Sequence, residues 1–201
     1  MKRRSLESAA ATYPYLQGLW ALPLGFLIIL TGISNLEERP SEPFMLGILG
    51  GGLLLCGVAG LYISRYYKDH YGEVTPTKSR QVRHAVANVA WVVVLFVGAG
   101  KFLFWSVESD FCVYASAFAL ATLVYYAILV GLRTHHVVIW VPLLVAGLLP
   151  IWGGLGLNRD PVAMMVDGVA LMASGLLDQR LLTRAFGSFT SLNLEKSNVE
   201  G

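Results

Sequence analysis

Six long apolar stretches constrain the fold of this chain more than any other feature. Each is close to the roughly 20 residues that an α-helix needs to cross a hydrocarbon layer of about 30 Å. None shows the apolar and polar alternation of barrel strands, so the sequence predicts an all-α protein, a polytopic transmembrane bundle of six helices. The stretches lie at about 15–33, 44–63, 84–104, 111–131, 137–154 and 162–177.

The composition excludes several other classes of protein. Only 14% of the 201 residues are charged and the mean hydropathy is +0.59, whereas soluble domains carry roughly 25% charged residues. Disorder of the whole chain is excluded too, because it requires low hydrophobicity. The net charge of +2 is too small to indicate nucleic-acid binding. We expect residues 1–186 to form a single transmembrane domain and the polar residues 187–201 to form a disordered cytoplasmic tail.

The positions of the basic residues predict the orientation in the membrane. With the N-terminus inside, only Arg39, Lys101 and Arg159 of the 15 Lys and Arg residues lie on the outer side. Cytoplasmic loops carry the excess of Lys and Arg, so both termini are predicted to be cytoplasmic, in a multi-pass protein of a bacterial cytoplasmic membrane. A basic cytoplasmic collar is predicted to meet anionic headgroups or a protein partner; it contains Arg65, Lys68, Lys78, Arg80 and Arg83.

Two ionisable residues fall inside predicted spans. Lys101 is near the outer end of the third stretch and Asp167 is a few residues into the sixth, so both would lie on the order of 6–9 Å below the outer boundary. A charge inside the membrane is costly unless it is paired or hydrated. We therefore hypothesise a buried ion pair between them; the alternative is that Lys101 extends to the outer interface.

The four histidines, His70, His84, His135 and His136, all fall at or near the predicted cytoplasmic boundary. Imidazole is a common metal ligand, so these residues are candidates for a metal or haem site. The sequence, however, offers no cysteine or carboxylate at a known ligand spacing from them. Interfacial histidines that contact headgroups or helix ends are the alternative, and we assign no metal and no cofactor from the sequence.

Small residues and prolines mark two further places. Glycines in the second stretch are typical of close helix packing, either within the bundle or against a partner or a second copy; they are Gly47, Gly50, Gly51, Gly57 and Gly60. The outer half of the fifth stretch is irregular, as expected of a hinge or of a transport pathway, or simply of kinked helices; it contains Pro142, Pro150, Gly153 and Gly154.

No catalytic residues can be assigned. The zinc-protease HExxH motif, the Gly-x-Ser-x-Gly elbow and the Walker loop are all missing from the sequence. The sequence therefore predicts an integral membrane protein without a catalytic site, acting as a membrane subunit or small transport component. The alternative is a membrane-embedded enzyme, or a redox or metal-binding protein, that uses Asp167 and Lys101 or the histidines of the inner face.

Overall fold

The structure is a computed structural model and describes residues 17–36, 42–71, 82, 86, 89, 111–129 and 131–199. No strand occurs in these residues, so the all-α prediction is confirmed for them. Two 3₁₀ segments, η2 (Gly18–Trp20) and η3 (Pro150–Asn158), accompany the α-helices. These are α2 (Ala21–Ser34), α3 (Glu42–Tyr71), α5 (Val113–Leu129), α6 (Thr134–Leu148) and α7 (Arg159–Val199).

Five of the six apolar stretches coincide with these helices. The stretch at 84–104 lies outside the described residues apart from Val86 and Val89, which are helical and exposed. Of the residues described with their side chains, one helical segment, Arg159–Arg184, is long and apolar enough to cross a membrane. The apolar segments Gly18–Ser34, Val113–Leu129 and Thr134–Leu148 are shorter.

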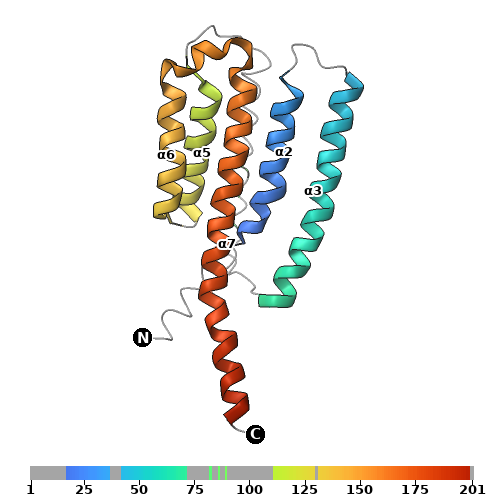
Figure 1. Cartoon of the computed structure of the whole chain (residues 1–201), viewed down its shortest axis with the longest axis vertical. Coiled ribbons are helices and arrows are strands. Elements are labelled where there is room, and N and C mark those ends of the chain that lie inside the picture. The colour runs from blue at the N-terminus through green and yellow to red at the C-terminus, as the bar shows by residue number, and fades with distance from the viewer. Residues whose placement is uncertain are drawn as a thin grey trace.

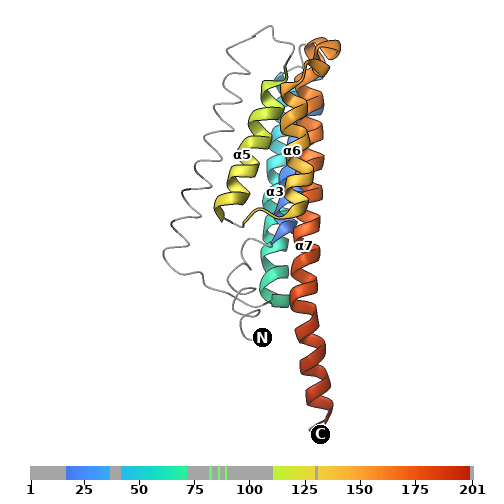
Figure 2. The same ribbon diagram turned by 90° about the vertical axis from the view of Figure 1, so that its left-hand side faces the viewer.

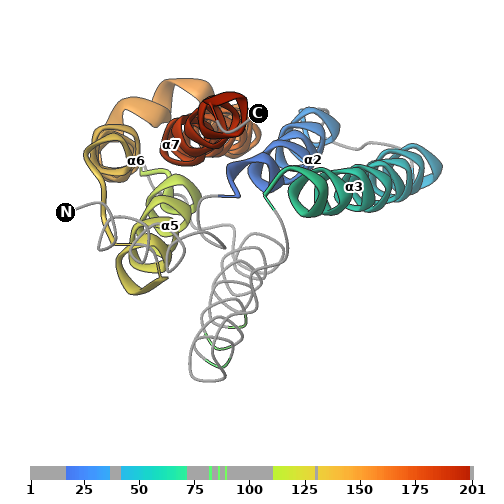
Figure 3. The same ribbon diagram turned by 90° about the horizontal axis from the view of Figure 1, so that it is seen from below.

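Helix α7 occupies the centre of the arrangement. Figure 1 shows α5 and α6 on one side of it and α2 and then α3 on the other, and Figure 3 shows the same order along the helix axes. Figure 2 shows that α7 extends well beyond the other helices towards the C-terminus. The backbone is helical as far as Val199, through residues that the sequence predicts to be disordered. No proline interrupts the chain after Pro161, so nothing there breaks the helical hydrogen bonds.

Helices α2 and α7 run antiparallel and pack backbone against backbone. A Cβ atom added to Gly25 would lie 2.6 Å from the carbonyl oxygen of Gly168, and one added to Gly168 would lie 2.6 Å from that of Gly25. A similar close backbone contact lies on each side of this pair along the helices. Gly18 packs against the backbone of Gly175, and Gly32 packs against that of Pro161. Because these positions recur every seven residues, they stay on one side of each helix.

Proline explains how α6 ends. Leu149 is extended, with φ −95° and ψ 148°, because the residue before a proline is pushed away from the helical region. Pro150 then begins η3, and α7 starts at Arg159. Pro142 lies within α6 and does not end this helix. Pro150, in contrast, follows the last residues of α6 and ends it.

Three buried groups of side chains hold the helices together. The central one joins α5, α6 and α7 and includes Phe118, Trp140 and Leu171. A second, around Cys112 and Trp152, lies where α5 begins and η3 follows α6. The third joins α3 to α7 through Tyr67 and Leu182. The Tyr67 hydroxyl accepts a hydrogen bond from the Leu19 N–H at 3.1 Å and donates one to Gln179 Oε1, so this group also fixes η2.

Candidate functional site

Three polar residues lie buried on one face of α7. Asp167, Ser174 and Asp178 are 0%, 0% and 2% exposed, and their spacings of seven and four residues keep them on the same face of a helix. Asp178 contacts residues at the start of α6, and Asp167 lies near Tyr114 on α5. The polar face of α7, defined by these three residues, is therefore turned towards α5 and α6.

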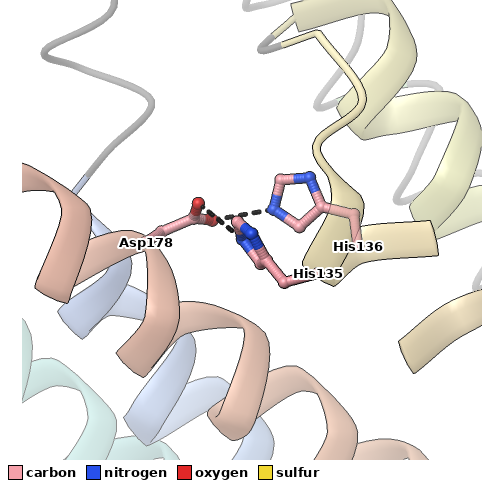
Figure 4. A group of neighbouring side chains, drawn as sticks. All are labelled: His135, His136 and Asp178. Atoms are coloured by element: carbon pink, nitrogen blue, oxygen red, sulfur yellow. Dashed lines mark hydrogen bonds and ion pairs between the residues drawn. The ribbon is translucent and has the colours of Figure 1, made fainter. Parts of the chain in front are cut away.

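Asp178 is the centre of a group of four side chains. Its Oδ1 lies 3.1 Å from His135 Nε2, and its Oδ2 lies 3.1 Å from His136 Nε2 (Figure 4). The guanidinium of Arg133 donates to Oδ1 at 3.4 Å. Both imidazoles thus direct the same ring nitrogen at one carboxylate.

The start of α6 positions these side chains. Arg133 is extended and precedes the helix, which places His135 and His136 in its first turn. The Arg133 N–H donates to His136 Nδ1 at 3.4 Å, and the ring of Tyr126 stacks on the His136 ring with centroids 3.7 Å apart. A carboxylate at the N-terminal end of a helix is favoured by the helix dipole, so the position of Asp178 suits its charge.

Burial differs among the members of this group. The His136 side chain is 0% exposed and that of Asp178 is 3% exposed, whereas those of His135 and Arg133 are 18% and 25% exposed. Burial, and next the neighbouring His136, lower the pKa of His135 below its ordinary value. The group therefore has a dry side at His136 and an edge that water reaches at His135 and Arg133.

Asp167 differs from Asp178 because its carboxyl oxygens have no hydrogen-bond partner among the described residues. The same is true of Ser174 Oγ and of Trp140 Nε1, which are also buried. Buried polar atoms are satisfied in most proteins, and a buried carboxylate without a partner is costly. The polar face of α7 therefore carries one carboxylate with three side-chain partners and one without a hydrogen-bond partner among the described residues.

The other predicted site residues either lie outside the described part of the chain or are not part of this group. Lys101 and His84 lie outside the described residues, so the proposed pair of Lys101 with Asp167 stays a hypothesis. His70 is exposed near the end of α3, on the opposite side of α7 from α6 (Figure 1). The hinge candidates are divided between α6, which holds Pro142, and η3, which holds Pro150, Gly153 and Gly154.

Most of the predicted glycine face of α3 contacts nothing in the described part of the chain. A Cβ added to Gly60 would lie 2.9 Å from Trp20, so Gly60 allows α3 to approach η2. The remaining four positions have no atom within 4 Å of an added Cβ; they are Gly47, Gly50, Gly51 and Gly57. Their role in packing, within the bundle or against a partner or a second copy, stays a prediction.

Sequence reasoning missed Asp178 and Arg133. A signal existed, because Asp178 follows Asp167 by 11 residues, which is three turns of an α-helix and returns to the same face. The fold joins this carboxylate to two histidines more than 40 residues away in the chain. It thereby supplies the acidic ligand that the sequence did not place beside His135 and His136.

Comparison with protein-family models, with curated proteins and with solved structures finds no match to this chain. Its class follows from its own features: an all-α protein with a central, apolar helix long enough to cross a membrane. That helix buries a polar face against its neighbours.

Proposed function

We propose that the chain is an integral membrane protein of six spans with both termini in the cytoplasm, acting as a small transport component or membrane subunit. In this proposal the working group inside the bundle is Asp167, which binds a proton or a small cation. The observation that carries the proposal is the complete burial of this carboxyl group without a partner among the described residues. Ionisable groups within membrane helices mark ion pathways and proton relays.

The apolar outer surface of α3 supports a lipid environment. The side chains of Leu53, Leu54 and Leu61 are 60%, 74% and 68% exposed, and the stretch 44–63 of this helix contains no charged residue. Large exposed apolar patches mark protein or membrane contacts. At the far end of the same helix, Arg65 and Lys68 are exposed, as expected of a basic collar against anionic headgroups.

Labelling with dicyclohexylcarbodiimide tests the chemistry proposed for Asp167. This apolar reagent adds to a protonated carboxyl group and rearranges to a stable N-acylurea, so the adduct is found by mass spectrometry of the digested protein. We expect the adduct on Asp167 in native membranes and its loss in Asp167→Asn. Asp160 is the matched control, because it is 26% exposed and paired with Arg159 at 3.8 Å. Labelling of Asp160 but not of Asp167 would contradict the proposal.

Flux measurements test the transport function. We expect proteoliposomes of the wild-type chain to take up protons under a potassium diffusion potential, and those of Asp167→Asn to lose this uptake. Equal uptake by both proteins would contradict the role of Asp167, and no uptake by either would contradict transport by the isolated chain. Purification from native membranes in mild detergent then examines the subunit function, which requires a stoichiometric protein partner.

The alternative function is a membrane-embedded enzyme, or a redox or metal-binding protein, that uses Asp167 and Lys101 or the histidines of the inner face. A chromophore or metal that co-purifies without a protein partner would favour it. A stoichiometric partner with neither would favour the subunit function.

A further inference from the structure

We infer that His135, His136 and Asp178 form a binding site for one divalent transition-metal ion, of the Zn²⁺ class. Within the described residues, this is the one group of three His, Cys, Asp or Glu side chains whose ligand atoms could hold a metal. The inference deepens the alternative function given above, because it names the ligands and the class of metal, and it is independent of proton transport by Asp167.

The distances fit a metal centre. All three ligand atoms lie within 4.8 Å of one another, and each imidazole Nε2 is 3.1 Å from a carboxylate oxygen. Four tetrahedral bonds of about 2.0–2.1 Å to Zn²⁺ put neighbouring ligand atoms roughly 3.3 Å apart. The two imidazole–carboxylate distances therefore need to change by only a few tenths of an ångström, whereas ligand atoms 4.8 Å apart must approach by about 1.5 Å before one ion can bind all three.

The chemistry of the ligands selects the class of metal. Two imidazoles and one carboxylate suit Zn²⁺, Fe²⁺ and similar ions, whereas Mg²⁺ and Ca²⁺ prefer oxygen ligands alone. Three protein ligands leave at least one position for water, as in catalytic rather than structural zinc sites. Figure 4 shows the ligands arriving from two separate elements, α7 and the first turn of α6, so the ion would also join these helices.

Neighbouring residues orient the ligands and determine which hydrogen bonds change when a metal binds. Stacking on Tyr126 fixes the His136 ring, and Arg133 contacts the carboxylate from the side that water reaches. For His136 Nε2 to bind the ion, the ring proton must reside on Nδ1. The ring then gives up the 3.4 Å contact from the Arg133 N–H. The Nδ1–H and the Arg133 N–H would then face each other as two donors, so metal binding also requires the start of α6 to shift and satisfy them elsewhere.

Metal titration of the full-length chain tests the site. The protein is purified without a histidine tag, stripped with a chelator and placed in lipid nanodiscs. Co²⁺ is added while its visible d–d absorption is recorded, and bound metal is counted by mass spectrometry. We expect one Co²⁺ per chain, displaced by Zn²⁺ but not by excess Mg²⁺.

Variants assign the signal to these residues. Asp178→Asn and His135→Ala should each weaken Co²⁺ binding by about 10-fold or more. Replacing a residue that only hydrogen-bonds to a metal ligand already lowers metal affinity by this factor. His70→Ala is the matched control and should bind as the wild type does, because His70 is exposed on α3. If Asp178→Asn fails to fold, as judged by circular dichroism and size exclusion, His135→Ala decides alone, since His135 is partly exposed.

Two results would overturn the inference. One is the absence of saturable Co²⁺ binding by the wild type. The other is binding that both ligand variants retain or that His70→Ala removes, which would identify an adventitious ion only. The four side chains would then be a hydrogen-bonded cluster that fastens α6 to α7.

Discussion

Replacement of Gly168 by alanine tests the packing of α2 against α7. The added Cβ would lie 2.6 Å from the Gly25 carbonyl oxygen and 3.2 Å from the Ile29 backbone nitrogen. Carbon contacts below 3.0 Å are essentially never found, so the two backbones must separate by at least about 0.4 Å. A neighbouring side chain cannot relieve this clash by moving, because the obstacle is the backbone of α2.

Two opposing effects determine how much Gly168→Ala changes the free energy of unfolding. Overpacking of a well-packed interface costs about 1–3 kcal/mol, and the better helix propensity of alanine offsets up to about 1 kcal/mol. We expect the free energy of unfolding to fall by about 1–2 kcal/mol, up to roughly 30-fold in the unfolding equilibrium. The assay is reversible unfolding in mixed micelles with increasing mole fraction of sodium dodecyl sulfate, followed by circular dichroism.

Gly57→Ala is the matched control for this substitution. Gly57 is also helical, but no atom lies within 4 Å of its added Cβ in the described part of the structure. Its replacement should leave the free energy of unfolding unchanged or raise it by up to about 1 kcal/mol. Equal stability of Gly168→Ala and the wild type, or equal losses in both variants, would refute the proposed backbone contact.

Three further substitutions can be measured in the same unfolding assay. Tyr67→Phe should lower the free energy of unfolding by about 1–2 kcal/mol, because it leaves the Leu19 N–H and the Gln179 side chain without the hydroxyl between them; no loss would contradict the bridge. Arg133→Gln should cost at most about 1 kcal/mol, since its ion pair is long and partly exposed, and a larger loss would show that the guanidinium is essential to the cluster. Asp167→Asn should change the free energy of unfolding by less than about 1 kcal/mol, because the described residues give the carboxyl group no hydrogen-bond partner to lose; a large loss would reveal a partner elsewhere in the chain and contradict the assignment of an open site.

The helices were predictable from sequence because each corresponds to one continuous apolar stretch. The end of α6 could also be foreseen, since Pro150 cannot continue a helix and disfavours the helical conformation of Leu149. The extension of α7 beyond residue 186 could not, because a polar composition alone does not distinguish an exposed helix from a disordered segment. Helix propensity and composition predict secondary structure poorly where the segment does not pack against a core.

The candidate site was only half predictable. Histidines 135 and 136 stand out in the sequence, but their carboxylate partner comes from another helix and is identified only when α6 lies against α7. The α2 and α7 interface was hidden for the same reason. Glycines 18, 25 and 32 repeat every seven residues, as do glycines 168 and 175, yet their significance depends on an antiparallel contact between distant segments.

The central claim, that this chain crosses a membrane several times, is tested most directly by the accessibility of two engineered cysteines. Asn158→Cys lies before α7 on the predicted outer side, and Leu132→Cys lies before α6 on the predicted inner side; both positions are exposed. In a background lacking Cys56 and Cys112, a membrane-impermeant maleimide should label Asn158→Cys in intact spheroplasts. It should label Leu132→Cys only after the membrane is opened. Labelling of both cysteines from the same side, or recovery of the protein in the soluble fraction, would contradict the account.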